Sequence, residues 1–163
     1  RVVLELLRHG VIAGEDRHLL VRVPNPWLEQ DEEKISKILV SIARANFIFH
    51  LACEHLEITP KQNAIYEITV PQVNSTSDLG AVMKIATLYR EAVDGLFAND
   101  RFLSARIPDE NRARLAARVA EVRMVPLVEN VGALAHLPEL LVELEKFAPS
   151  PDILRVFIAM SDC

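Results

Sequence analysis

Residues 122–129 have the sequence Val-Arg-Met-Val-Pro-Leu-Val-Glu, a nearly continuous apolar run that ends in an acidic side chain. Short runs of this kind predict strands that are buried on both faces, which is typical of parallel sheets. Two further runs, Ala64–Val70 and Leu154–Met160, have the same character, and His18–Val23 is a fourth expected strand. The sequence therefore predicts four strands, of which at least three belong to a parallel sheet.

Helical patterns occupy the segments between these strands. Apolar residues recur at the spacing i, i+3, i+4 and i+7, which forms one stripe on an amphipathic helix. A more basic helix is expected at Asp109–Ala120, and residues 1–7 have the character of a segment inside a helix. The three apolar stripes are Ile35, Ile38, Leu39 and Ile42; Leu79, Val82, Met83 and Ala86; and Leu137, Leu140, Leu141 and Leu144.

The alternation of strands and helices predicts right-handed parallel crossovers. Two α/β architectures fit this order: an open doubly wound sheet and a closed (β/α)₈ barrel. The open sheet usually carries a glycine-rich loop after its first strand, and this chain has five glycines and no such loop. We therefore expect part of a TIM-type barrel with about four of its eight strands. Residues 1–163 then form one partial barrel segment of a longer enzyme.

The composition excludes several classes of protein. The net charge of −5 argues against nucleic-acid binding, which requires a basic surface. We expect no membrane segment, because no apolar run approaches the roughly 20 residues that span a bilayer. Cys53 and Cys163 are far apart, so we expect no disulfide framework and a reducing, cytoplasmic location.

Charged side chains follow the expected strands at matching positions. Arg22 lies at the end of the first strand, Glu129 follows the third, and Asp162 follows the fourth. In a barrel the carboxyl ends of the strands meet at one rim, where active sites lie. One cation and two carboxylates at that rim indicate a hard divalent metal with an anionic ligand, because magnesium takes one or two protein carboxylates.

Position alone leaves other interpretations open. A polar residue at a strand end is commonly the start of a solvated loop, and this applies to Glu129 and to Asp162. For Arg22, an ion pair with a barrel carboxylate competes with ligand binding. Trp27, which follows the first strand, packs over the barrel rim or forms a wall of the substrate site.

Five segments in fixed order resemble the archaeal-type phosphoenolpyruvate carboxylases, and the resemblance covers residues 15–162. They are Leu20–Pro26 (LVRVPNP), Ser41–Arg44 (SIAR), Ile65–Pro71 (IYEITVP), Met124–Glu129 (MVPLVE) and Arg155–Asp162 (RVFIAMSD).

The resemblance implies a (β/α)₈ carbon–carbon lyase that fixes carbon dioxide. Such an enzyme joins bicarbonate to phosphoenolpyruvate through carboxyphosphate and an enolate, and it releases oxaloacetate and phosphate. The resemblance assigns Mg²⁺ or Mn²⁺ to Glu129 and Asp162, and it makes Arg22 a catalytic residue that binds the anionic substrate. It also implies a homo-oligomer, a homotetramer, whose later strands complete the site. We therefore expect these 163 residues alone to be inactive.

Two alternatives are of different classes. One is another metal-dependent barrel enzyme that handles a pyruvate enolate, similar to a class II aldolase or a phosphoenolpyruvate mutase. The other is a non-catalytic assembly fragment, because a four-stranded sheet leaves two open edges that pair with partners.

A second group of potential metal ligands lies in the second helical segment. His50, Cys53 and His55 are soft-metal ligand types, but a structural zinc site requires four ligands. We expect a buried thiol and two histidines on the helix surface instead.

Overall fold

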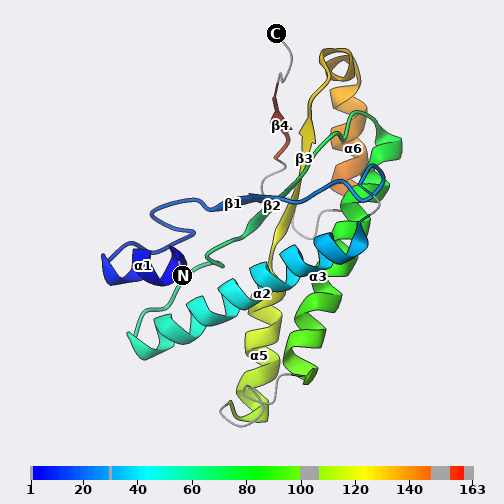
Figure 1. The fold of residues 1–163 in the computed structure, drawn as a ribbon. Coiled ribbons are helices and arrows are strands. Elements are labelled where there is room, and N and C mark those ends of the chain that lie inside the picture. Colours follow the sequence, from blue (N-terminus) through cyan, green and yellow to red (C-terminus); the bar gives the residue numbers. More distant parts are fainter. Residues whose placement is uncertain (1, 30, 100–106, 148–154, 160–163) are drawn as a thin grey trace.

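The computed structural model describes residues 2–29, 31–99, 107–147 and 155–159 (Figure 1). Each expected strand and helix is found there, although the strands are shorter than predicted. The strands are β1 (Leu20–Arg22), β2 (Glu67–Val70), β3 (Arg123–Val128) and β4 (Phe157–Ile158). The helices are α1 (Val2–Arg8), α2 (Glu32–His55), α3 (Leu79–Asn99), α5 (Asp109–Ala120) and α6 (Leu137–Phe147), with short 3₁₀ turns at Thr76–Asp78 and Val131–His136.

The four strands form one parallel sheet in the order β1-β2-β3-β4. In a doubly wound sheet the strand order reverses at a switch point, whereas in a barrel each strand pairs with the next one along the chain. The observed order is consecutive throughout. The prediction of a partial barrel is confirmed, and the strands form half of one with helices between them.

The two faces of this sheet differ in what covers them. Successive side chains of a strand point to opposite faces, and Val23, Ile68, Val70 and Val128 belong to the main apolar core. In that core they are joined by residues from α2, α3, α5 and α6, so this is the helix-covered face (Figure 1). We call the opposite face the inner face. Side chains alternate along each strand, and paired residues of neighbouring strands point to the same face. The inner face therefore carries Leu20, Arg22, Glu67, Thr69, Arg123, Val125, Leu127, Glu129, Arg155 and Phe157.

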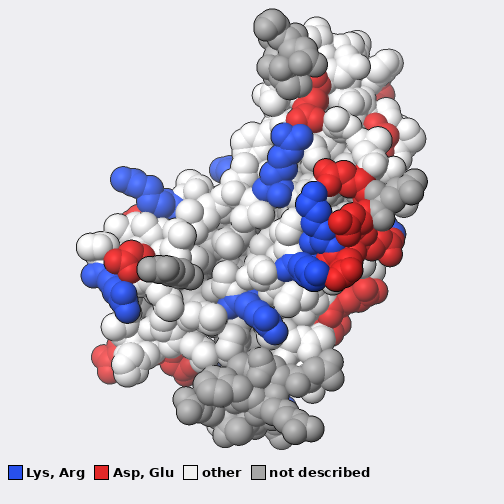
Figure 2. Space-filling view, in the orientation of Figure 1, with Lys and Arg blue, Asp and Glu red and all other residues white. Residues whose placement is uncertain are grey.

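Helix α2 is the longest helix and packs most extensively against α3. Asp31 caps its N-terminus by accepting a hydrogen bond from the Lys34 amide at 2.9 Å, and Glu32 and Glu33 occupy the first turn. Negative charge is favourable there because of the helix dipole. Figure 2 shows acidic and basic side chains side by side where α2 begins, in agreement with the ion pair between Lys34 and Glu29 at 2.9 Å.

By length and composition alone, α2 is long and apolar enough to cross a membrane. This differs from the expectation that no segment of the chain passes that test. Its apolar face, which includes Ile35, Leu39 and Phe47, lies in the main core. The central helix of a globular core satisfies the same criterion, so the observation is weak support for a membrane segment.

Two buried asparagines tie the helices to the segment that precedes β2. The Asn63 side-chain amide donates to the carbonyl oxygens of Arg118 and Glu121, both at 2.8 Å, where α5 ends. Asn46 on α2 donates to the carbonyl of Ile65 and accepts from its amide, each at 2.8 Å. These contacts satisfy backbone groups that would otherwise be buried without partners, and they fix the approach to β2.

His50 takes part in the same network, which corrects the expectation that it lies on the helix surface. Its Nε2 lies 2.8 Å from Oδ1 of Asn63. Because the Asn63 amide donates to carbonyls, Oδ1 must accept, and His50 is the donor through Nε2–H. Burial lowers the pKa of His50 below its ordinary value. The histidine is therefore a neutral core residue.

The buried His50 makes the stability of the fold depend on pH. Below pH 6.5 or so the unfolded chain binds a proton at this residue that the folded chain resists. The free energy of unfolding should therefore fall as the pH is lowered from 7.5 to 5. Glutamine can donate the same hydrogen bond without titrating, so His50→Gln should flatten this dependence in urea denaturation. The exposed His55 is the control: His55→Gln should keep the wild-type dependence, and an unchanged profile in His50→Gln contradicts the assignment.

Candidate functional site

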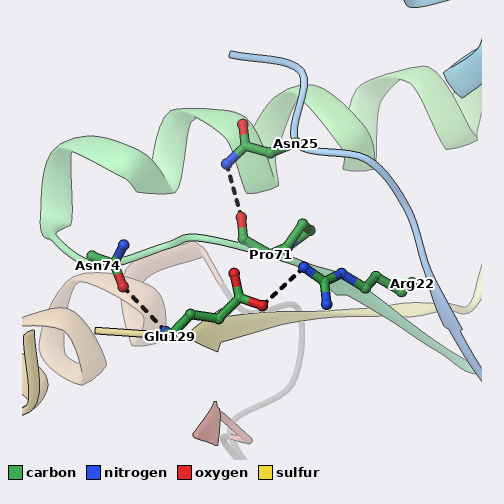
Figure 3. A network of polar contacts seen from close by, with 5 residues as sticks. All are labelled: Arg22, Asn25, Pro71, Asn74 and Glu129. Carbon is green, nitrogen blue, oxygen red and sulfur yellow. Dashed lines mark hydrogen bonds and ion pairs between the residues drawn. The ribbon is translucent and has the colours of Figure 1, made fainter. Parts of the chain in front are cut away.

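The sheet brings Arg22 and Glu129 together at its carboxyl rim. Arg22 is the last residue of β1, and Glu129 follows β3 directly. An Nη2 atom of the guanidinium donates to Oε1 of the carboxylate at 2.8 Å, across the intervening strand β2 (Figure 3). Two of the three residues predicted to meet at this rim, Arg22 and Glu129, are therefore in contact, and the ion pair between Arg22 and a barrel carboxylate is present.

The two partners differ in their access to solvent. The Glu129 side chain is 9% exposed, whereas that of Arg22 is 58% exposed. A carboxylate so far removed from water requires a cation or hydrogen-bond donors to remain charged. Arg22 supplies the cation and leaves most of its own surface open, so the same guanidinium is accessible to an anionic ligand.

The loops after β1 and β2 are held at this rim by asparagine side chains. Asn25 is buried; its amide donates to the Pro71 carbonyl at 2.8 Å, and its Oδ1 accepts from the Trp27 amide at 2.9 Å. Oδ1 of Asn74 accepts from the Glu129 amide at 3.2 Å (Figure 3). Both asparagines link neighbouring strand ends, and they fix the backbone positions from which Arg22 and Glu129 project.

The turn after β2 is also conformationally unusual. Gln72 has φ of 56°, in the left-handed region that non-glycine residues rarely adopt. The chain then turns back, and the Val73 amide donates to the Leu127 carbonyl at 3.1 Å. This contact places Asn74 over the end of β3, next to Glu129.

Trp27 packs against the start of α3. A Cβ atom built on Gly80 would lie 3.3 Å from the indole ring, and Nζ of Lys84 lies 5.9 Å from the ring centroid. The side chain is nevertheless 54% exposed. These contacts agree with the first of the two interpretations of Trp27, in which the side chain packs over the barrel rim.

Of the two predicted metal ligands, the structure describes Glu129. Asp162 lies outside the described residues, and among residues 2–29, 31–99, 107–147 and 155–159 no group of three potential metal ligands gathers. Glu129 suits a hard cation by its chemistry, and its Oε2 makes no hydrogen bond to any residue in these ranges. Magnesium is commonly held by one or two carboxylates, with water and substrate as the other ligands. The donor present therefore fits magnesium.

The soft-metal alternative finds no support in the described residues. Cys53 is buried and His55 is exposed, so the two do not share a site. Burial raises the pKa of the Cys53 thiol to about 11, and the thiolate is the form that binds metals. The expected buried thiol is confirmed.

Sequence reasoning missed a second charged pair on the inner face. Glu67 of β2 is buried, and its carboxylate lies 3.1 Å from Nη1 of Arg155. Thr69, two residues further along β2, has a buried hydroxyl with no hydrogen-bond partner among the described residues. The signal was present in the sequence, because Glu67 is the one charged residue in a run that is otherwise apolar or β-branched.

The sequence of the chain is similar to those of one group of enzymes. The family described as phosphoenolpyruvate carboxylase matches residues 1–163. Phosphoenolpyruvate carboxylases of Methanopyrus kandleri and Halobacterium salinarum are 28% and 33% identical over 166 and 152 residues. These alignments cover 99% and 91% of this chain, but 27% and 29% of the relatives. The chain thus spans less than a third of the length of these relatives, and the matches favour the carboxylase over the aldolase-like alternative.

The hydrogen bonds of Asn25 predict a measurable loss of stability on truncation. Asn25→Ala leaves the Pro71 carbonyl and the Trp27 amide without their partner, which should lower the free energy of unfolding by about 2 kcal/mol. Urea denaturation followed by circular dichroism measures it. Asn25→Asp keeps the acceptor for the Trp27 amide but places a buried carboxylate against the Pro71 carbonyl, so it should be at least as destabilising. Lys61→Ala, at an exposed side chain, is the control; equal stabilities of Asn25→Ala and this control would contradict the role of the bridge.

Proposed function

The chain belongs to the phosphoenolpyruvate carboxylase family, and from this premise we propose that it supplies the metal site and one substrate-binding arginine of such an enzyme. The reaction joins bicarbonate to phosphoenolpyruvate and gives oxaloacetate and phosphate. The observation that supports the proposal is the Arg22–Glu129 pair at the rim of the half-barrel. A cation and a carboxylate at strand ends suit a metal-bound substrate that carries two anionic groups, a carboxylate and a phosphate.

Glu129 and Asp162 are the proposed ligands of Mg²⁺ or Mn²⁺. When bound, the metal would act as a Lewis acid that stabilises negative charge on the enolate oxygen of the substrate. Glu129 holds one carboxylate oxygen on Arg22 and leaves Oε2 without a hydrogen-bond partner in the described chain. This arrangement leaves a lone pair for the ion while the side chain remains fixed in orientation.

Arg22 is the proposed substrate-binding and catalytic residue. Its guanidinium presents several N–H donors in one plane, which match a phosphate or a carboxylate bidentately. One guanidinium nitrogen, Nη2, donates to Glu129, and more than half of the side chain is exposed. The arginine therefore bridges the metal ligand and the anionic substrate, and it orients both.

The remainder of the barrel is proposed to come from further chain. The relatives are more than three times as long as the matched region, and half a barrel has two open sheet edges. We expect residues beyond this sequence to close the barrel and to supply the other groups of the site, and the 163 residues alone to be inactive. A cytoplasmic homo-oligomer, a homotetramer, is the proposed assembly.

The metal assignment predicts that Glu129→Gln nearly abolishes activity. The amide keeps the shape but loses the charge that binds the cation, so turnover should fall by at least about a hundredfold. The measurement is metal- and bicarbonate-dependent formation of oxaloacetate by the full-length protein. Glu145→Gln, at an exposed position on α6, should retain wild-type activity. Wild-type turnover in Glu129→Gln would remove Glu129 from the metal site.

The role of Arg22 predicts a change in substrate affinity. Arg22→Lys keeps the charge but loses the bidentate geometry, so KM for phosphoenolpyruvate should rise about tenfold. KM for bicarbonate, measured in the same assay, should change much less. Equal effects on both substrates would indicate that Arg22 acts only through the fold.

A further inference from the structure

A groove of about 700 Å³ lies between the first turns of α3 and α6. Two apolar side chains of its walls face solvent, since Met83 is 39% exposed and Val142 is 57% exposed. The wall that α6 forms also carries Glu139 and Glu143. A groove with apolar walls and an acidic edge suits a helix that presents small side chains beside basic ones.

The two carboxylates of this groove are available to cations from outside the chain. Glu139 and Glu143 are at the i, i+4 spacing, which places their Cβ atoms about 5–6 Å apart on one face of α6. Within the described ranges, Glu143 pairs with Lys146 of its own helix, and Glu139 makes no ion pair. The Glu143–Lys146 pair is exposed to solvent, and such pairs contribute little to stability.

Helix α5 has a surface that complements the groove. Its buried side packs against α2 and α3, and its other side carries four exposed residues, Ala113, Arg114, Ala117 and Arg118. The two arginines are also at i, i+4, so their spacing matches that of the two carboxylates. Neither guanidinium forms an ion pair or a hydrogen bond with any residue that the structure describes. The two alanines allow a close approach, because the distance between packed helices depends on the side chains at the contact.

We propose that the groove between α3 and α6 receives α5 of a second copy of this chain, so that Glu139 and Glu143 face Arg114 and Arg118 of the partner subunit. The lengths of the two helices agree with this contact. α5 has 12 residues and α6 has 11, which correspond to about 18 Å and about 16 Å. The charges of one helix can therefore face those of the other along both turns.

The positions of α5 and α6 on α3 allow the contact to form twice. α6 lies beside the beginning of α3, and α5 lies beside its second half (Figure 1). A twofold axis across α3 exchanges these two ends, so each copy can insert its own α5 and receive that of the other. This inference gives the proposed homo-oligomer a contact surface. It does not depend on the metal site, because none of its residues lies at the rim with Arg22 and Glu129.

The test is the association of the full-length protein, measured by analytical ultracentrifugation as the Kd for dissociation of its subunits. Glu139→Arg together with Glu143→Arg places like charges opposite each other, so Kd should rise at least about tenfold. Arg114→Glu together with Arg118→Glu should raise Kd to a similar extent. All four substitutions in one chain restore opposite charges, so Kd should return toward the wild-type value. Glu145→Arg, at an exposed position of α6 outside the groove, is the control and should leave Kd unchanged.

A cross-link tests the same contact without a change of charge. Full-length protein that carries both Ala117→Cys and Val142→Cys should form a covalent dimer on oxidation, whereas each single variant should not. No dimer above the level of the single variants would overturn the inference.

The charge exchange has outcomes that separate the possible occupants of the groove. Wild-type Kd in either double variant overturns the inference. Failure of the fourfold variant to recover also overturns it, and indicates that another part of the polypeptide or a different protein fills the groove. A monomeric wild-type protein overturns this inference together with the proposed homo-oligomer. The metal assignment is tested separately, by the activity of Glu129→Gln.

Discussion

A parallel strand can be reached from its parallel neighbour only by a crossover that returns the chain to the same end of the sheet. In this protein the constraint applies at every step, because the four strands pair in the order of the chain. Every carboxyl end therefore lies at one rim of the sheet. Arg22 and Glu129 are 107 residues apart in sequence, yet this topology places them within 2.8 Å. The inner face, the rim and the ion pairs all follow from the same parallel register.

The inner face differs from an ordinary apolar sheet surface because it contains charged side chains that have little access to solvent. Two carboxylates, of Glu67 and Glu129, are almost entirely buried, and each is matched by an arginine that stays half-exposed. Arginine suits this arrangement, since its charge persists at any physiological pH and its planar group contacts carboxylates at fixed geometry. The result is a face whose negative groups are fixed in position by partners on strands two places away.

Much of this arrangement could be predicted from the sequence because it rests on local patterns. Apolar runs located all four strands and helical spacing located most of the helices. Charged residues that end or interrupt these runs drew attention to Arg22 and Glu129. The partner of a charged residue was harder to predict. Glu67 was visible as a charge within an apolar strand, but its pairing with Arg155 depends on the register between β2, β3 and β4, which no local pattern encodes. His50 was placed wrongly on the helix surface for a similar reason, since its burial depends on Asn63, thirteen residues away in a segment without periodicity.

The proposed metal site is tested most directly by a crystal structure of the full-length protein with Mg²⁺ bound. We predict one ion at the carboxyl rim of the barrel, with oxygens of both Glu129 and Asp162 at about 2.1 Å and the Arg22 guanidinium still in contact with Glu129. An ion bound elsewhere, or the carboxylates of Glu129 and Asp162 on opposite sides of the sheet, would contradict it.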